Sequence, residues 1–175
     1  MRVLITGAAG NLGSLFTRHL LAQEIGVLRL MVFQRDVPAD LKVAGKTEIV
    51  RADLAKRESL VAAVKGVDVI VHFAGVLFKA NPERFLNTTN TGYFKNLVDI
   101  AMENNVRRII LISFPHVEGP TSIEKSASGR LDGTPVSVHA KTRLDEERYL
   151  FANAFASSKA AKCRYCFFHK IPKCV

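Results

Sequence analysis

A glycine-rich turn near the N-terminus constrains the fold of this 175-residue chain more than any other feature. The turn, Gly7-Ala8-Ala9-Gly10-Asn11-Leu12-Gly13, follows the apolar segment Arg2–Thr6 and leads into a segment with helical spacing. The first glycine permits a sharp turn, the second a close approach of the backbone to a ligand, and the third close helix–sheet packing. The amide groups at the start of the helix attract an anion. The pattern therefore predicts a site for the diphosphate of a dinucleotide, and the alternative is a turn with a structural role only.

Segments with strand-like and helix-like patterns alternate along the chain, which predicts an α/β fold with a doubly wound parallel sheet. We expect strands at residues 2–6, 27–33, 47–50, 67–73 and 107–112, and helices at 11–23, 57–66, 81–104 and about 137–156. Helical spacing predicts that the first helix buries one row of residues and the second another. These rows are Leu12, Leu15, Phe16, Leu20 and Leu21 in the first helix, and Leu60, Val61 and Val64 in the second.

Length and charge divide the chain into one domain, expected at residues 1–155, and a basic tail at 156–175 that forms a last strand at 163–171 or is disordered. Five of the 25 basic residues and none of the 16 acidic residues lie in this tail. The domain itself is thus only mildly basic, so we expect no nucleic-acid partner. No segment has the length of a membrane span and no signal peptide precedes the first strand, so we expect a cytoplasmic protein.

All three cysteines lie in the tail, where Cys163, Cys166, His169 and Cys174 form the pattern C-x2-C-x2-H-x4-C. The pattern superficially suggests zinc, but the gap before the histidine is shorter than in usual zinc sites. We therefore expect free thiols and no metal.

The glycine turn, the acid after the third strand and the small residues after the fourth strand together resemble an extended short-chain dehydrogenase/reductase of the NAD-dependent epimerase/dehydratase branch. The resemblance covers about residues 1–155. It implies a Rossmann fold in three α/β/α layers and an enzyme of the oxidoreductase or epimerase type, acting on a small alcohol, a ketone or a sugar nucleotide. Members of this family carry a C-terminal substrate lobe, which this chain lacks, so the resemblance implies a C-terminally truncated form.

The resemblance also implies which residues hold an NAD(P) cofactor. The turn cradles the pyrophosphate, Asp53 accepts a hydrogen bond from the adenine amino group, and small residues pass beneath the adenosine. For Asp53 the alternative is a cap on the helix that begins near residue 57. The full set is Gly7, Gly10, Asn11, Leu12, Gly13, Arg35, Asp53, Leu54, Phe73, Ala74 and Gly75.

Two further residues in this region are open to two interpretations. His72 precedes Phe73 and is interpreted as a packed core histidine. Asn90 matches an asparagine that the family keeps in the helix below the active site, and it could equally be a surface residue.

The end of the second strand bears on the choice between NAD and NADP. An acid there favours NAD, whereas an arginine accommodates the additional phosphate of NADP. The chain has Gln34-Arg35-Asp36, preceded by Phe33 where an NAD-dependent protein often has Asp. Arg35 resembles the basic residue of NADP-dependent members, so NADP is favoured over NAD.

The catalytic motif of the family is Tyr-x-x-x-Lys, on the helix after a long loop. Here His139 takes the position of the tyrosine and Arg143 that of the lysine, while Glu147 matches a downstream acid. Histidine transfers protons near neutral pH, and arginine keeps the positive charge of the lysine. Ser113, at the end of the fifth strand, would orient the substrate. The alternatives are a dinucleotide-binding sensor or regulatory module without catalysis, or a truncated and inactive cofactor domain. In relatives the long helices after strands four and five pair, which implies a homodimer.

Overall fold

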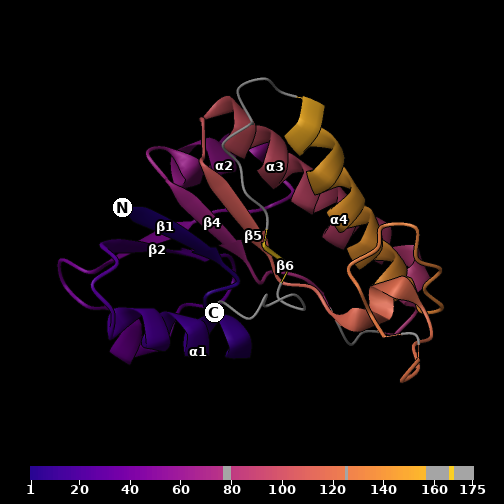
Figure 1. Cartoon of the computed structure of the whole chain (residues 1–175). Coiled ribbons are helices and arrows are strands. Elements are labelled where there is room, and N and C mark those ends of the chain that lie inside the picture. The colour runs from indigo at the N-terminus through magenta and orange to yellow at the C-terminus, as the bar shows by residue number, and fades with distance from the viewer. Residues whose placement is uncertain (77–79, 125, 157–165, 168–175) are drawn as a thin grey trace.

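The computed structural model describes residues 1–76, 80–124, 126–156 and 166–167 and has six parallel strands in the order β3-β2-β1-β4-β5-β6 (Figure 1). The strands are β1 (Arg2–Thr6), β2 (Val27–Val32), β3 (Thr47–Arg51), β4 (Val69–His72), β5 (Arg108–Leu111) and β6 (Cys166–Phe167). The α-helices are α1 (Asn11–Leu21), α2 (Arg57–Val64), α3 (Tyr93–Glu103) and α4 (Val138–Ala156). Short 3-10 turns lie at Ala39–Leu41, Pro82–Arg84 and Pro115–Glu118, and a π-helix at Asn87–Gly92.

The strand order places a crevice beside β1. Successive strands run outward from β1 through β2 to β3, and then on the other side from β4 through β5 to β6. The register pairs Thr6 of β1 with Met31 of β2 and with His72 of β4. In open α/β sheets a crevice forms at the carboxyl ends of the strands where the order reverses, and ligands bind there. In this chain that point lies between β1 and β4.

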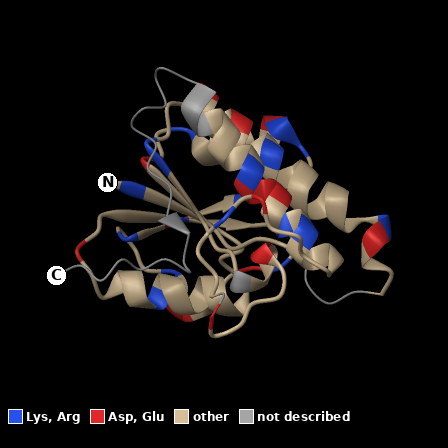
Figure 2. Cartoon of the chain, turned by 45° about the vertical axis from the view of Figure 1, so that its right-hand side comes forward, with Lys and Arg blue, Asp and Glu red and all other residues tan. Residues whose placement is uncertain are grey.

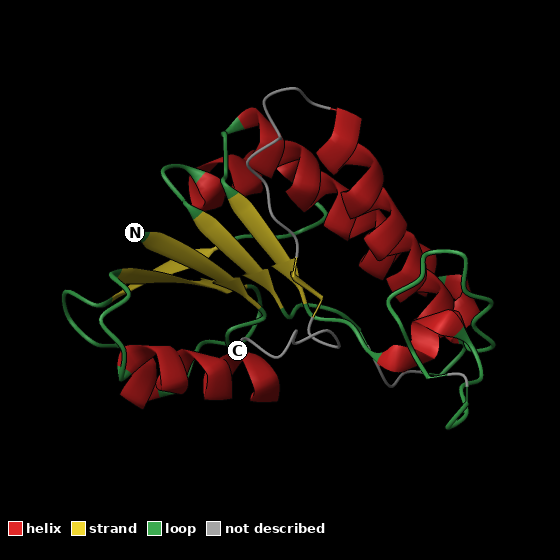
Figure 3. Ribbon diagram, in the orientation of Figure 1, coloured by secondary structure: helices red, strands yellow, loops and turns green. Residues whose placement is uncertain are grey.

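Helices cover both faces of the sheet, as the doubly wound fold requires: α1 lies against one face and α2, α3 and α4 against the other (Figures 1 and 3). Alternate strand residues supply the two cores. Ile5 and Leu30 pack with Phe16 on the α1 side, whereas Leu4 and Ile70 pack with Phe94 and its neighbours on the other side. The predicted α/β/α arrangement is confirmed.

The predicted buried row of α1 is wrong in its first half. Leu12 and Leu15 are 62% and 60% exposed, and the buried residues are Gly13, Ser14 and Thr17. The glycine turn is the physical reason, since a Cβ on Gly13 would overlap the carbonyl oxygen of Gly7. The backbone of α1 comes so close to the turn that only small side chains fit beneath its first two turns.

Other sequence-based expectations need smaller corrections. Val61 of α2 is 45% exposed, although it was expected in the buried row. The helical zone predicted at 81–104 consists of a 3-10 turn, a π-helix and α3. β6 lies within the range expected for a last strand, and the remainder of that range is outside the described residues. The same is true of Cys163, His169 and Cys174.

Basic and acidic residues are interspersed over the described part of the chain (Figure 2). Several of them form ion pairs, such as Arg29 with Glu48 at 2.9 Å and Arg57 with Asp99 at 3.1 Å. Among the described residues, no helix has the length and apolar character needed to cross a membrane.

Candidate functional site

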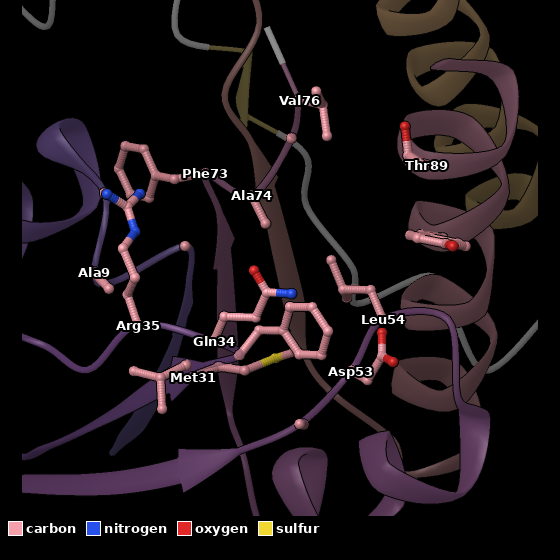
Figure 4. A pocket seen from close by; sticks show the side chains of 17 residues that line it. Ala9, Met31, Gln34, Arg35, Asp53, Leu54, Phe73, Ala74, Val76 and Thr89 are labelled. Atoms are coloured by element: carbon pink, nitrogen blue, oxygen red, sulfur yellow. The ribbon is translucent and has the colours of Figure 1, made fainter. Parts of the chain in front are cut away.

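A cleft of about 490 Å³ opens at the carboxyl ends of the strands, at the point where the strand order reverses (Figure 4). The glycine turn, the ends of β2, β3 and β4, and the beginning of α3 contribute to its walls. The lining residues are Gly7, Ala9, Gly10, Met31, Val32, Phe33, Gln34, Arg35, Ala52, Asp53, Leu54, Phe73, Ala74, Gly75, Val76, Thr89 and Tyr93.

The glycine turn is built so that its backbone forms one end of the cleft. Gly7 has a φ of 68°, and a Cβ there would lie 2.8 Å from the amide nitrogen of Ala74. Gly10 is the N-cap of α1, and within the described part of the chain this helix start has no side-chain cap hydrogen bond. A helix start without a side-chain cap in a cleft is a binding site for an anion such as a diphosphate. The three glycines therefore fit a dinucleotide, because side chains at these positions would fill the turn or the cleft.

Asp53 lies on the opposite wall, after β3. Its carboxylate accepts a hydrogen bond from the amide of Ala55 at 2.9 Å, and its own amide donates one to the hydroxyl oxygen of Ser59 at 3.0 Å. Lys56 is the N-cap of α2, so the alternative interpretation of Asp53 as a helix cap is wrong. Asp53 and Leu54 both line the cleft, which leaves the carboxylate at the ligand crevice.

A buried histidine supports the segment that follows β4. His72 is 2% exposed, and its Nδ1 lies 2.8 Å from the hydroxyl oxygen of Thr6. The same hydroxyl oxygen accepts a hydrogen bond from the amide of Ala74 at 3.3 Å, which ties the cleft wall to β1. Burial, together with the charge of Arg143, lowers the pKa of His72 to about 3. His72 is thus a packed core histidine, as predicted.

The low pKa of His72 makes stability depend on pH in a defined direction. The folded state holds this imidazole neutral, so its contribution is complete above the unfolded pKa of about 6.5 and is lost as the pH falls toward 3. Between pH 7.5 and 5.0 the wild type should lose about 2 kcal/mol of unfolding free energy relative to His72→Asn, whose amide replaces the bond to Thr6. Urea unfolding of both proteins at both pH values measures this difference. Equal pH dependences would contradict a neutral buried imidazole.

Asn90 holds the next part of the same wall. Its side-chain oxygen accepts a hydrogen bond from the amide of Val76 at 2.9 Å, and its side-chain nitrogen donates to the carbonyl of Val76 at 3.2 Å. Asn90 is 6% exposed, so the interpretation as a surface residue is wrong. It lies in the π-helix Asn87–Gly92, and such helices frequently occur at functional sites.

The end of β2 presents a basic side chain to the cleft. Arg35 is exposed and lines the cleft, and Figure 4 shows it on the same side as Ala9. Asp36 is not among the lining residues. Its carboxylate binds Lys42 at 2.7 Å and the amide of Val37 at 2.9 Å, and these hydrogen bonds lower the pKa of Asp36. The positive charge of Arg35 is therefore available to a ligand in the cleft, because the carboxylate of Asp36 is bound to Lys42 and Val37.

Arg143 lies behind the cleft wall and does not line it. Its guanidinium is buried and forms an ion pair with Glu146. A Cβ on Gly75, which does line the cleft, would lie 3.0 Å from Nη2 of Arg143. Burial raises the pKa of Glu146 to about 7 despite the arginine. Arg143 thus keeps a positive charge close to the cleft. Its partner Glu146 is partly protonated near neutral pH.

Ser113 is likewise bound to an acid of α4. Its hydroxyl donates to one oxygen of Glu147, which is fully buried, while the other oxygen of Glu147 has no hydrogen-bond partner among the described residues. Burial raises the pKa of Glu147 to about 7. His139 is half-buried on the first turn of α4. None of the three catalytic candidates, Ser113, His139 and Arg143, is among the residues that line the cleft.

The structure thus brings together eight of the predicted cofactor residues around one cleft. These are Gly7, Gly10, Arg35, Asp53, Leu54, Phe73, Ala74 and Gly75. Asn11, Leu12 and Gly13 lie beside it in the first turn of α1. Sequence reasoning missed Thr89 and Tyr93, which lie four residues apart. Their i, i+4 spacing next to Asn90 was the available signal, because such residues share a helix face.

Comparison with known proteins supports a nicotinamide dinucleotide as the cofactor. The profile of a family described as NAD(P)H-binding matches residues 7–149. A uronate dehydrogenase from Pseudomonas syringae pv. tomato is 36% identical over 118 residues, which cover 67% of this chain and 41% of that protein. An inverting UDP-N-acetylglucosamine 4,6-dehydratase from Campylobacter jejuni is 25% identical over 173 residues, covering 91% of this chain and 46% of that protein. The chain therefore spans less than half of the length of these relatives.

Solved structures give the same fold. A mutant of the uronate dehydrogenase from Agrobacterium tumefaciens, complexed with NAD, superimposes with a TM-score of 0.76 at 27% identity over 91% of this chain and 57% of that chain. A UDP-glucose 4-epimerase superimposes with a TM-score of 0.78 at 19% identity, over 95% of this chain and 50% of that chain, and so supports the fold alone. With this fold, this cleft and the family profile, the chain belongs to the NAD(P)H-binding family and is a relative of the extended short-chain dehydrogenases/reductases.

Proposed function

We propose that residues 1–155 form the NAD(P)-binding domain of an oxidoreductase or epimerase-type protein that acts on a sugar or a sugar nucleotide. The cleft at the reversal of strand order is the observation that carries this proposal. The glycine turn and the amides of Asn11, Leu12 and Gly13 would hold the diphosphate, and Asp53 with Leu54 would hold the adenine end. The cofactor, when bound, supplies hydride transfer to or from a carbonyl or alcohol carbon.

The chemistry that the chain's own residues would add is proton transfer and electrostatic support. His139 would take or give the hydroxyl proton, Arg143 would favour the charge that develops beside Gly75, and Ser113 would orient the substrate. The buried guanidinium near Gly75 supports the role of Arg143. The relatives named for uronate and for UDP-sugars support a sugar or sugar nucleotide as the substrate class.

The second candidate is a sensor or regulatory module that binds the dinucleotide without turning it over. The arrangement of the catalytic candidates favours this function, since Arg143 is bound to Glu146 and Ser113 to Glu147. None of the three side chains lines the cleft. In this case the Arg143–Glu146 and Ser113–Glu147 pairs stabilise the wall of the cleft. The module would respond to whether the dinucleotide is bound.

One pair of experiments separates the two functions. NADPH and NADH are titrated into the full chain by calorimetry, and absorbance of the reduced cofactor is then followed with uronates and UDP-sugars as substrates. Binding with turnover of one substrate class supports the enzyme, and loss of that turnover in His139→Ala would assign the proton transfer. Binding without any turnover favours the sensor. No binding of either cofactor would refute both.

NADP is the cofactor form that the charge at the end of β2 favours. Arg35 lines the cleft, whereas the carboxylate of Asp36 is bound to Lys42. A 2′-phosphate would gain a charge-assisted contact with the guanidinium, and a free 2′-hydroxyl would not.

Replacement of Arg35 tests this preference. Arg35→Ala should weaken NADPH binding about tenfold, the effect of one charge-assisted hydrogen bond, and should change NADH binding less than about twofold. Arg18→Ala is the matched control, because this exposed arginine pairs with Asp40 and does not line the cleft. Calorimetry gives the dissociation constants of NADPH and NADH for each variant, and the ratio of the two constants is compared with that of the wild type. An equal loss for NADPH and NADH in Arg35→Ala would refute a phosphate-binding role.

We include in the proposal a homodimer formed through α3 and α4, without a nucleic-acid partner. The two helices pack against each other on the same face of the sheet and leave their outer surfaces available for a second copy (Figure 1). Light scattering of the purified chain would give a mass of two copies if the proposal is right and of one copy if it is wrong.

A further inference from the structure

One wall of the cleft carries an aromatic side chain that the cofactor assignment does not use. Tyr93 is the first residue of α3 and lines the cleft, half-buried, together with Thr89 of the preceding π-helix. The π-helix changes to the α-helix between these two residues, so this change in helix type lies at the wall of the cleft.

Contacts of α3 locate Tyr93 along the cleft. Asn96, three residues further on, donates a hydrogen bond to the carbonyl of Leu54 at 3.0 Å. This face of α3 therefore lies against the loop after β3, since residues three apart share a helix face. Figure 4 shows Leu54 and Asp53 near the helix that bears Thr89, and Ala9 of the glycine turn on the far side. Tyr93 is thus at the end of the cleft remote from the glycine turn.

The two other aromatic side chains of the cleft follow β4 and β2. Phe73 packs against Phe16 of α1 with ring centroids 5.2 Å apart, on the side of the glycine turn. Phe33 follows β2 next to Arg35 and is 54% exposed. Phe33 follows Val32, which pairs with Arg51 of β3, so Phe33 lies near the same end of the cleft as Asp53. Tyr93 is the half-buried aromatic residue at this end, whereas Phe33 is exposed.

We propose that the ring of Tyr93 is the stacking surface for the purine base, with Leu54 as the apolar contact beside it. The inference rests on the proposed dinucleotide function and names a specificity-determining residue within it. A flat aromatic base gains from stacking on an aromatic ring, and an alanine substitution at such a surface weakens binding by roughly 5- to 150-fold. The ring, and not the phenolic hydroxyl, supplies this contribution.

Binding of fragments tests the inference independently of turnover. AMP, nicotinamide mononucleotide and NADPH are titrated into the full chain and three variants of Tyr93. Tyr93→Ala and Tyr93→Leu should weaken AMP and NADPH about tenfold and leave nicotinamide mononucleotide unchanged, whereas Tyr93→Phe should stay within about twofold of wild type. The leucine variant keeps an apolar side chain at the helix start, so a folded protein is available for comparison. Tyr149→Phe is the control, because Tyr149 binds Asp99 at 2.6 Å outside the cleft.

Tyrosine resonances give a second readout. The chain has three tyrosines and no tryptophan, so ring-labelled tyrosine yields few signals. The signal that is absent in Tyr93→Phe should shift on addition of AMP, owing to the ring current of the base.

Unchanged or tighter AMP binding in both Tyr93→Ala and Tyr93→Leu would overturn the inference and leave the proposed function intact. Equal losses in Tyr93→Phe and Tyr93→Ala would assign the effect to the hydroxyl and also overturn it. Failure of the wild type to bind NADPH would remove the proposed function and the inference with it.

Discussion

Gly10→Leu should lower the affinity for NADPH and NADH at least about 100-fold while the chain remains folded. Gly10 lines the cleft as the N-cap of α1, so a side chain there would occupy the space of the diphosphate and remove several charge-assisted hydrogen bonds. Its φ of −84° suits any residue, and a Cβ would meet only the carbonyl oxygen of Gly7, at 3.2 Å. The expected cost to folding is therefore about 1 kcal/mol. Calorimetry for binding and urea unfolding for stability measure the two effects separately.

Two other glycines provide the controls for this experiment. Gly45→Ala places a side chain at a φ of 73° with no atom within 4 Å of the new Cβ, so it should cost about 1 kcal/mol and leave cofactor affinity unchanged. Gly13→Ala should lose both stability and binding, because its Cβ would lie 2.9 Å from the carbonyl carbon of Gly7. Wild-type affinity in a folded Gly10→Leu protein would show that the diphosphate does not bind at the turn.

Arg143→Leu should destabilise the chain by up to about 3–5 kcal/mol above pH 7, where the wild type holds Glu146 as a carboxylate paired with Arg143, because the variant must protonate this buried group or leave it charged without a partner. Replacing both partners, in Arg143→Leu with Glu146→Leu, should restore much of this loss, since neither member of the pair is then left buried alone. Arg148→Ala is the matched control on the same helix. Its ion pair with Asp145 is about half exposed at 3.6 Å, and its loss should cost less than about 1 kcal/mol.

The destabilisation by Arg143→Leu should grow with pH. Without the arginine, Glu146 folds as the neutral acid, and its folded pKa, already raised by burial, rises further. Both folded proteins bind a proton that the unfolded state releases above about pH 4.5, but the wild type releases it near pH 7 and the variant only at higher pH. The additional loss of unfolding free energy in the variant therefore appears above about pH 7. Urea unfolding at pH 5.5 and 8.0 should give the smaller loss at pH 5.5. A loss independent of pH would contradict an unpaired buried carboxyl at Glu146.

The sequence predicts the fold and the side of the cleft formed by the glycine turn and Asp53. In these segments the local sequence pattern favours the same backbone structure that the complete fold requires. The turn from Gly7 to Gly13 specifies its own backbone, and a nearly continuous apolar run specifies strands such as Val27–Val32, whose two faces are both covered. Asp53 follows a strand directly, so its place at the carboxyl edge of a parallel sheet follows from the topology alone.

The remaining features depend on contacts between segments far apart in the sequence. Leu12 and Leu15 match a buried helical row, but the close approach of Gly13 to Gly7 rotates α1 and exposes them. Arg143 and Ser113 match a catalytic pattern, and only the packing of α4 shows that Glu146 and Glu147 engage them. Tyr93 lines the cleft because a π-helix ends at the residue before it, and helical periodicity alone does not predict such a change.

A crystal structure of the full chain with saturating NADPH tests most directly whether the opening βα turn is the diphosphate site. We expect the diphosphate at the amides of residues 10–13, with the purine between Leu54 and Tyr93 and the 2′-phosphate at Arg35. A diphosphate bound elsewhere on the chain, or no bound nucleotide at a concentration that saturates the relatives, would contradict the account.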